Sequence, residues 1–306
     1  MIDPDPDFKP LVGVADEIDQ GLRRVLAPNP SPMTFRGTNT YLLGTRGIAV
    51  IDPGPDDPAH LAALLATLLP GQHISHIIVT HAHLDHSPLS RRLARITGAP
   101  VLAFGDALAG RSAIMQQLAA SGLVGGGEGV DAAFAPDVIT QDGAEIVGDG
   151  WRLEVIHTPG HFGNHISLGW NDTLFCGDLV MGWASSLVSP PDGDLSDFMA
   201  SCRRLRAMPW RRFHPGHGAA IDAPLARLDW LIDHRLSRET AILAALNEGP
   251  ACSQALAHRI YTTTPAHLMP AATRNVLAHL VDLTFKSAVA PIGPLAASAR
   301  FAHLKN

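Results

Sequence analysis

Four side chains that can bind a metal ion lie within six residues, His81-Ala-His83-Leu-Asp85-His86. Residues 75–80 before them are apolar and β-branched, which predicts a buried strand, and residues 87–96 have the pattern of a helix. The motif therefore lies on a turn between a strand and a helix. Imidazole and carboxylate ligands suit catalytic metal sites, whereas closed structural zinc sites favour thiolates. Because the chain has 16 histidines, a histidine-rich surface loop is the alternative.

Three later segments share one arrangement, in which a strand-like stretch is followed by a His or Asp beside Gly or Pro. They end at residues 158–161, 175–178 and 213–218. Loops at the ends of strands hold ligands well, because the sheet fixes their bases while their tips converge. These segments can therefore supply the ligands that a two-metal site still needs. Between them the chain alternates predicted strands and helices, which indicates an α/β fold.

The order HxHxDH, then His, then Asp, then His resembles the dinuclear pattern of the metallo-β-lactamase superfamily. This resemblance extends over roughly residues 20 to 220. It implies a four-layer αββα sandwich, two mixed sheets between helices, in a catalytic domain of residues 1–225. It also implies the ligands. His81, His83 and His161 would bind the first metal ion, Asp85, His86 and His217 would bind the second, and Asp178 would bridge the two.

The resemblance implies two divalent metal ions as cofactors, and we expect zinc. Manganese and iron(II) are alternatives, because the same ligands accept them. A hydroxide bridging the two ions would be the nucleophile, since two cations stabilise hydroxide far better than bulk water does. Asp85 and Asp178 would therefore serve catalysis as well as metal binding.

Two further residues are candidates for roles around the metals. His165 lies four residues after a proposed ligand, and it could contact substrate or donate a proton to the leaving group. A hydrogen-bonded histidine at the start of the next strand is the alternative. Asp52 resembles the family's buried aspartate after an early strand, which would orient the metal turn. Its alternative is an ordinary turn residue before Pro-Gly.

Composition excludes several classes of protein. The net charge of −6 argues against a strongly basic nucleic-acid binder. The three cysteines lack metal-site spacing and suit a reducing cytoplasm. The acidic, proline-rich residues 1–7 do not resemble a signal peptide, and no apolar run is long enough to predict a membrane span. We therefore expect a cytoplasmic protein with no membrane partner, and a homodimer is left open.

The C-terminal part, residues 226–306, differs from the rest of the chain. Seven basic and three acidic residues follow position 234, a balance of +4. Helices are predicted at residues 237–246, 252–260 and 269–286, followed by a small hairpin, and this order resembles a winged helix. Such a domain could bind nucleic acid, or it could pack beside the metal cleft and shape substrate access. We expect the second role, because the basic residues are scattered rather than aligned on one helix.

Residues 29–34 and 37–44 resemble the opening of the lactamase-β-2-like hydrolases, which share this C-terminal domain and include endoribonucleases acting on single-stranded RNA. We therefore expect a metal-dependent hydrolase of a small ester, thioester or lactone, with a single-stranded-RNA endoribonuclease as the alternative. A non-catalytic binding module would not need seven ordered ligands. Residues 162–165 and the loop 181–194 depart from the family pattern and leave the substrate open. The glycine-rich residues 121–129 predict a flexible loop, without a phosphate-binding pattern.

Overall fold

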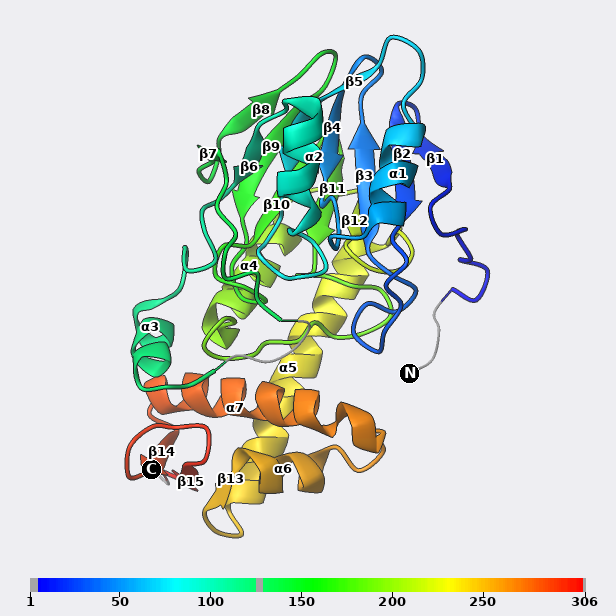
Figure 1. Cartoon of the computed structure of the whole chain (residues 1–306). Coiled ribbons are helices and arrows are strands. Elements are labelled where there is room, and N and C mark those ends of the chain that lie inside the picture. Colours follow the sequence, from blue (N-terminus) through cyan, green and yellow to red (C-terminus); the bar gives the residue numbers. More distant parts are fainter. Residues whose placement is uncertain (1–4, 125–128, 305–306) are drawn as a thin grey trace.

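The computed structural model describes residues 5–124 and 129–304, and two stacked β-sheets form the centre of its larger part (Figure 1). The first sheet has seven strands in sequential order, antiparallel up to β4 and parallel from β4 onward. Its strands are β1 (Ala15–Asp19), β2 (Leu22–Leu26), β3 (Asn39–Leu43), β4 (Gly47–Ile51), β5 (His73–Ile78), β6 (Val101–Ala103) and β7 (Val138–Ile139). The apolar, β-branched runs of the sequence thus become its central strands, as expected for strands buried on both faces.

The second sheet has five strands in the order β12-β11-β10-β9-β8, and only the β11–β12 pair is parallel. Its strands are β8 (Glu145–Val147), β9 (Arg152–His157), β10 (Ile166–Trp170), β11 (Thr173–Gly177) and β12 (Arg212–Pro215). The turn between β10 and β11 places Asn171 at a φ of 53°, a left-handed conformation that asparagine tolerates better than most residues. This short hairpin brings Asp178, just after β11, to the same end of the molecule as the metal turn.

Side chains alternate between the two faces of each sheet and so define the layers. In β4, Ile48 and Val50 pack on one face with residues of helices α1 (Pro58–Ala66) and α2 (Leu89–Thr97). Ala49 and Ile51 face the other sheet. Helices α4 (Leu195–Arg206) and α5 (Pro224–Leu246) cover the outer face of the second sheet. The predicted four-layer αββα sandwich is confirmed.

The C-terminal domain combines helices with a small sheet and confirms the predicted winged-helix-like order. It contains the second half of α5, β13 (Ala251–Cys252), α6 (Ser253–Ile260), the 3₁₀ turn η1 (Ala266–Leu268), α7 (Met269–Phe285), β14 (Val289–Ile292) and β15 (Arg300–His303). The three strands form a separate sheet in the order β13-β15-β14. Helix α3 (Ala113–Ala120) of the catalytic domain joins this core through Met115 and Leu118.

Helix α5 is longer than the sequence analysis predicted and connects the two domains (Figure 1). The predicted helix of residues 237–246 is wrong at its start, because the helix already begins at Pro224. Proline suits the first helical turn, where a backbone N–H has no helical partner. The expected domain boundary after residue 225 therefore falls inside the first turn of a continuous helix.

The loop of residues 181–194, the junction loop, fills the junction between the domains. The buried Arg235 of α5 donates to the Ser186 carbonyl and, over 2.9 Å, to Oδ1 of Asn275 on α7. The backbone N–H of Val188 donates to the same oxygen over 3.0 Å. The loop conformation is therefore fixed by the C-terminal helices. Separately, no helix in the described ranges is long and apolar enough to cross a membrane.

Candidate metal centre

The metal turn, residues 80–87, connects β5 to α2. The strand ends at Ile78, two residues earlier than expected, and α2 begins at Leu89. Inside the turn the N–H groups of His86 and Ser87 both donate to the His83 carbonyl over 3.0 Å. This local hydrogen bonding folds the chain so that four ligand side chains converge.

The structure brings the seven predicted ligands together in two adjacent groups. The first group is His81, His83 and His161, and the second is Asp85, His86, Asp178 and His217. All seven residues are buried, with at most 7% of their surface exposed. Asp178 lies between the groups: its Oδ2 is 3.2 Å from His217 Nε2 and 3.7 Å from His161 Nε2. This carboxylate is therefore placed to contact ions in both groups.

The chemistry of these atoms fits metal ions. His83 Nδ1 is 2.9 Å from His81 Nε2 and 3.0 Å from His161 Nε2. Nitrogens bound tetrahedrally to one zinc ion at about 2.0–2.1 Å would be about 3.3 Å apart, so the group is close to a ligand arrangement. Both carboxylate oxygens of Asp85 are buried: Oδ1 has no hydrogen-bond partner among the described residues, and Oδ2 lies 3.1 Å from His217 Nε2 and 3.3 Å from His86 Nε2, the nitrogens of two other proposed ligands. Buried carboxylates without donors are costly, and a cation would satisfy them.

The carboxylate of Asp52 holds the metal turn through hydrogen bonds. Its Oδ1 accepts the Thr80 backbone N–H over 2.7 Å, and its Oδ2 accepts the Thr80 hydroxyl over 2.8 Å. The same Oδ2 lies 3.0 Å from His86 Nδ1. This contact leaves His86 Nε2 free to bind metal, which is the common role of a carboxylate behind a histidine ligand. The structure places Asp52 as an orienting group and not as an ordinary turn residue.

Backbone carbonyls orient two further ligands. His161 Nδ1 lies 2.7 Å from the Leu187 carbonyl, and His217 Nδ1 lies 3.2 Å from the Gly37 carbonyl. Since a carbonyl only accepts, each Nδ1 must carry the proton and each Nε2 is left as the metal ligand. The Leu187 carbonyl belongs to the junction loop, so the C-terminal domain indirectly orients a metal ligand.

Two glycines allow this close packing. A Cβ at Gly216 would lie 2.3 Å from Asp178 Oδ1 and 2.7 Å from His86 Cε1. At Gly177, with a φ of 46°, a Cβ would lie 2.5 Å from His165 Nε2. Any larger side chain would therefore displace a ligand or its support, which explains the glycines directly before Asp178 and His217.

The two groups differ in protonation. Burial lowers the pKa of His83 to about 3 and holds the pKa of His81 well below its usual range. Burial alone would also lower the pKa of His217, but Asp178 and Asp85 raise it to about 10. The first group is therefore neutral and ready to bind, whereas an ion entering the second must displace a proton. Metal binding to the second group should weaken as the pH falls.

His165 does not lie where a substrate could reach it, and its expected role in substrate contact or proton donation needs correction. The side chain has no exposed surface, and its Nε2 accepts the Asp178 backbone N–H over 3.1 Å. Its Nδ1 lies 3.0 Å from the Thr158 hydroxyl. Burial also holds the pKa of His165 well below its usual range, so the ring stays neutral. His165 positions Asp178 through the backbone of that residue, which agrees with the alternative of a hydrogen-bonded histidine at the start of the next strand.

Residues 37–44, which resemble the opening of the lactamase-β-2-like hydrolases, support a metal ligand in the structure. Asn39 Nδ2 donates to the carbonyls of Pro215 and Gly218 over 3.0 and 2.9 Å. The Tyr41 hydroxyl donates to the Pro215 carbonyl over 2.7 Å. These bonds clamp the turn that carries His217. An asparagine and a tyrosine two residues apart give no signal of such a role without the fold.

The glycine-rich residues 121–129 lie partly outside the described residues, because 125–128 are not among them. The structure describes the C-terminal end of this segment, where the Leu84 N–H donates to the Gly129 carbonyl over 3.1 Å. Val130 forms a β-bridge with His83. This end of the segment therefore contacts the metal turn.

Comparison with known proteins agrees with this geometry. Residues 33–217 match the family model described as the metallo-beta-lactamase superfamily, and residues 252–286 match the beta-lactamase associated winged helix domain. The chain belongs to the metallo-β-lactamase superfamily. It is 32% identical over 267 residues to a beta-lactamase-like protein 2 homolog of Caenorhabditis elegans, covering 85% of this chain and 83% of the relative.

A second relative carries a functional name. An atrochrysone carboxyl ACP thioesterase of Aspergillus fumigatus is 29% identical over 278 residues, covering 88% of this chain and 79% of the relative. Among solved structures, a beta-lactamase domain protein from Burkholderia ambifaria has a TM-score of 0.80 at 22% identity, covering 98% of this chain and 96% of that chain. The two-domain fold is therefore shared. A protein crystallised in a di-iron-bound form has a TM-score of 0.50 at 28% identity, covering 67% of this chain and 97% of that one.

Proposed function

We propose that this chain is a dinuclear metal-dependent hydrolase of a small ester, thioester or lactone, and that a thioester is the substrate. The observation that carries the proposal is the pair of adjacent ligand groups with Asp178 between them. The name of the A. fumigatus relative supports the thioester among the three. We propose zinc for both ions, with manganese or iron as substitutes that the same ligands accept.

Bound at these groups, two divalent ions would polarise the substrate carbonyl and lower the pKa of water, so that hydrolysis proceeds at neutral pH. The protein supplies the rest. Asp178 is held by His165 from behind, and Asp52 fixes the metal turn. All seven ligands are buried, so bulk water does not compete with them for the metal ions. Each side chain is therefore fixed before substrate arrives, which is the arrangement that catalysis requires.

RNA cleavage is the weaker candidate, because binding a polyanion needs accessible cations. On α4, where the sequence places a run of arginines, Arg204 is paired with Asp142 and Arg206 with Asp229. These pairs reduce the free positive charge on that face. A small substrate, by contrast, requires no extended basic surface.

A substrate screen tests the proposal. Zinc- and manganese-loaded protein is assayed on acyl thioesters, lactones, a β-lactam and single-stranded RNA. We expect thioester hydrolysis, two metal ions per chain by elemental analysis, and a loss of at least about 1000-fold in kcat/KM for Asp178→Ala. The matched control is Asp172→Ala, at an exposed aspartate after β10. Wild-type turnover by Asp178→Ala, or RNA as the only substrate cleaved, would overturn the proposal.

A further inference from the structure

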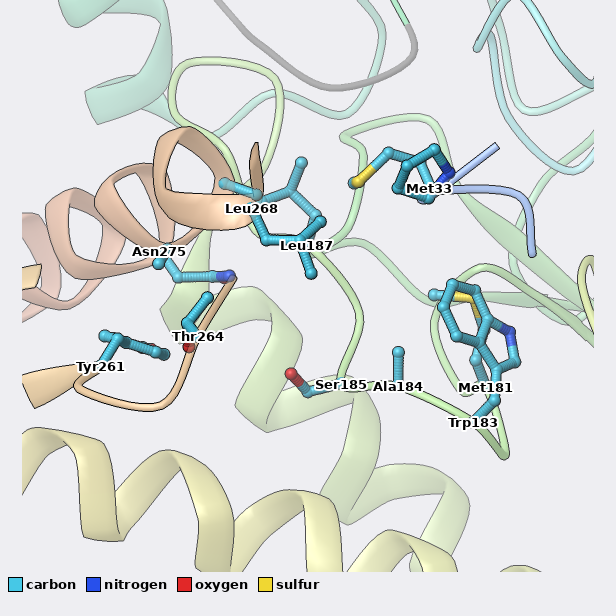
Figure 2. Close-up of a pocket in the computed structure, with 13 residues that line it drawn as sticks. Met33, Met181, Trp183, Ala184, Ser185, Leu187, Tyr261, Thr264, Leu268 and Asn275 are labelled. Carbon is cyan, nitrogen blue, oxygen red and sulfur yellow. The ribbon is translucent and has the colours of Figure 1, made fainter. Parts of the chain in front are cut away.

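A cavity of about 210 Å³ lies where the two domains meet (Figure 2). Met33 from the loop before β3, Trp183 and Leu187 from the junction loop, and Leu268 and Asn275 from the C-terminal domain line it. We propose that this cavity, the junction pocket, binds the acyl part of the substrate, a short uncharged chain that carries a carbonyl or hydroxyl oxygen. This inference rests on the proposed function of the metal centre.

The position of the pocket is suited to a substrate whose reacting carbon lies at the metals. Leu187 lines the pocket, and the carbonyl of the same residue accepts the His161 Nδ1 proton over 2.7 Å. Trp183 also lines the pocket, and its ring packs closely on Gly218, the residue after His217. A Cβ added to Gly218 would lie only 2.7 Å from this ring. Trp183 is also stacked on Phe35, with ring centroids 4.9 Å apart. Leu187 and Trp183 therefore line the pocket and also contact the turns of two metal ligands, so the pocket lies beside the metal centre.

The side chains that line the pocket favour an uncharged ligand. The 13 described residues that line the pocket include no acidic, basic or histidine side chain. Methionine, leucine, tryptophan and alanine side chains form most of the surface, and such surfaces bind apolar chains. A free carboxylate or a phosphate would lose its hydration there without a compensating charge. The volume is below the 300–1,000 Å³ of typical drug-sized sites, so the chain must be short.

One buried polar group gives the pocket its specificity. Asn275 is 9% exposed, and its Oδ1 accepts both the Val188 N–H and Arg235 Nη1. Because these two donors fix the oxygen, the amide nitrogen must point the other way. Figure 2 shows this nitrogen directed toward Thr264 and Leu187. The amide N–H groups are therefore presented as donors, and they call for an acceptor oxygen on the ligand.

The Ser185 hydroxyl is a second polar group at the opposite wall, and Figure 2 shows it directed toward the interior of the pocket. A hydroxyl can donate or accept, so it adapts to either a carbonyl or a hydroxyl on the chain. Tyr261 and Thr264 also line the pocket and carry hydroxyl groups. A few polar groups in a mostly apolar pocket are the usual means of fixing ligand orientation. The preferred acyl group therefore carries oxygen along its chain and is not a plain hydrocarbon.

Binding is measured by calorimetry with non-hydrolysable ketones, in which a methylene replaces the sulphur of hexanoyl- and 5-oxohexanoyl-N-acetylcysteamine. Metal-loaded wild-type protein should bind the 5-oxo compound about 3- to 10-fold more tightly, the effect of one hydrogen bond. Asn275→Asp keeps an oxygen for Val188 and Arg235 but replaces the pocket-facing donor with an acceptor. This preference should then disappear or reverse.

A second variant keeps the test decisive if Asn275→Asp folds poorly. Ala271→Phe fills the pocket from α7 at a half-buried position, and it should weaken both ligands at least 10-fold. The control Ala241→Phe, at a half-buried position of α5 outside the pocket, should bind as wild type. Unchanged affinities in both pocket variants, with thioesters still cleaved, would overturn the junction pocket alone. If the binding pattern appears but no thioester is cleaved, the ligand class stands and the proposed hydrolase function fails.

Discussion

The metal turn and the junction loop both support metal ligands, but they are held in place by different parts of the chain. In the metal turn, hydrogen bonds to the His83 carbonyl and the carboxylate of Asp52 fix the conformation. In the junction loop, Arg235 and Asn275 of the C-terminal helices do so. The first region is therefore encoded within the catalytic domain, whereas the second depends on the other domain. The C-terminal domain is thus part of the machinery that orients His161.

Removing the hydrogen bonds that Arg235 gives to the junction loop and to Asn275 should have the largest effect on stability. Arg235→Met keeps an apolar stem beside Phe198 but leaves the buried Ser186 carbonyl without its donor. Hydrogen bonds from a charged group contribute about 1.5–3 kcal/mol each, so we expect the free energy of unfolding to fall by about 3 kcal/mol. Urea denaturation measures this. Arg206→Met, at a half-exposed ion pair, is the control and should cost less than about 1 kcal/mol. Equal losses in both variants would contradict the comparison.

Breaking the support of the metal turn should affect metal binding more than folding. Asp52→Asn replaces one accepting oxygen with an amide that cannot accept the His86 Nδ1 proton. Loss of such a partner typically lowers metal affinity about 10- to 100-fold, or about 1.4–2.7 kcal/mol. Competition with a chelator gives this affinity directly. The nearby exposed Asp56→Asn should behave as wild type. A variant that keeps full affinity would mean that the turn holds itself without Asp52.

The smallest effect concerns the end of the junction loop, where Asp194 caps α4 and Asp197 lies in its first turn. Burial, helped by the charge of Asp194, raises the pKa of Asp197 to about 6. This pKa exceeds the unfolded value of about 3.9, so the stabilising contribution of its proton is complete below about pH 4 and is lost as the pH rises through 6.

Asp197→Asn removes the loss of stability that follows ionisation of Asp197 at high pH. The variant should be more stable than wild type at pH 8 by about 1 kcal/mol, a value that already allows for solvent screening of a half-buried group. It should show no gain near pH 4. Denaturation at the two pH values checks both statements, and a gain of the same size at pH 4 would rule out the charge of Asp197 as its cause.

The sequence predicted much of this molecule because its main signals are local. The HxHxDH spacing indicated a ligand cluster on a strand-to-helix turn, and the alternation of predicted strands and helices indicated the α/β fold. The four layers came from the family resemblance. His165 was misjudged because proximity in sequence to His161 does not show on which side of Asp178 the ring lies. The Leu187 carbonyl had no signal at all, since any residue offers the same backbone oxygen. Contacts made by the backbone, or across domains, need the fold.

The single helix α5, with 23 residues shared between the domains, has a consequence for how this chain can change. Each residue of an α-helix advances the chain by about 1.5 Å and turns it by about 100°. One residue inserted between Arg235 and the C-terminal core would therefore rotate that core relative to the sheets and separate Asn275 from Val188. Substitutions along α5 keep this angular register, whereas insertions and deletions destroy it. The contacts between the two domains therefore require the present length of α5.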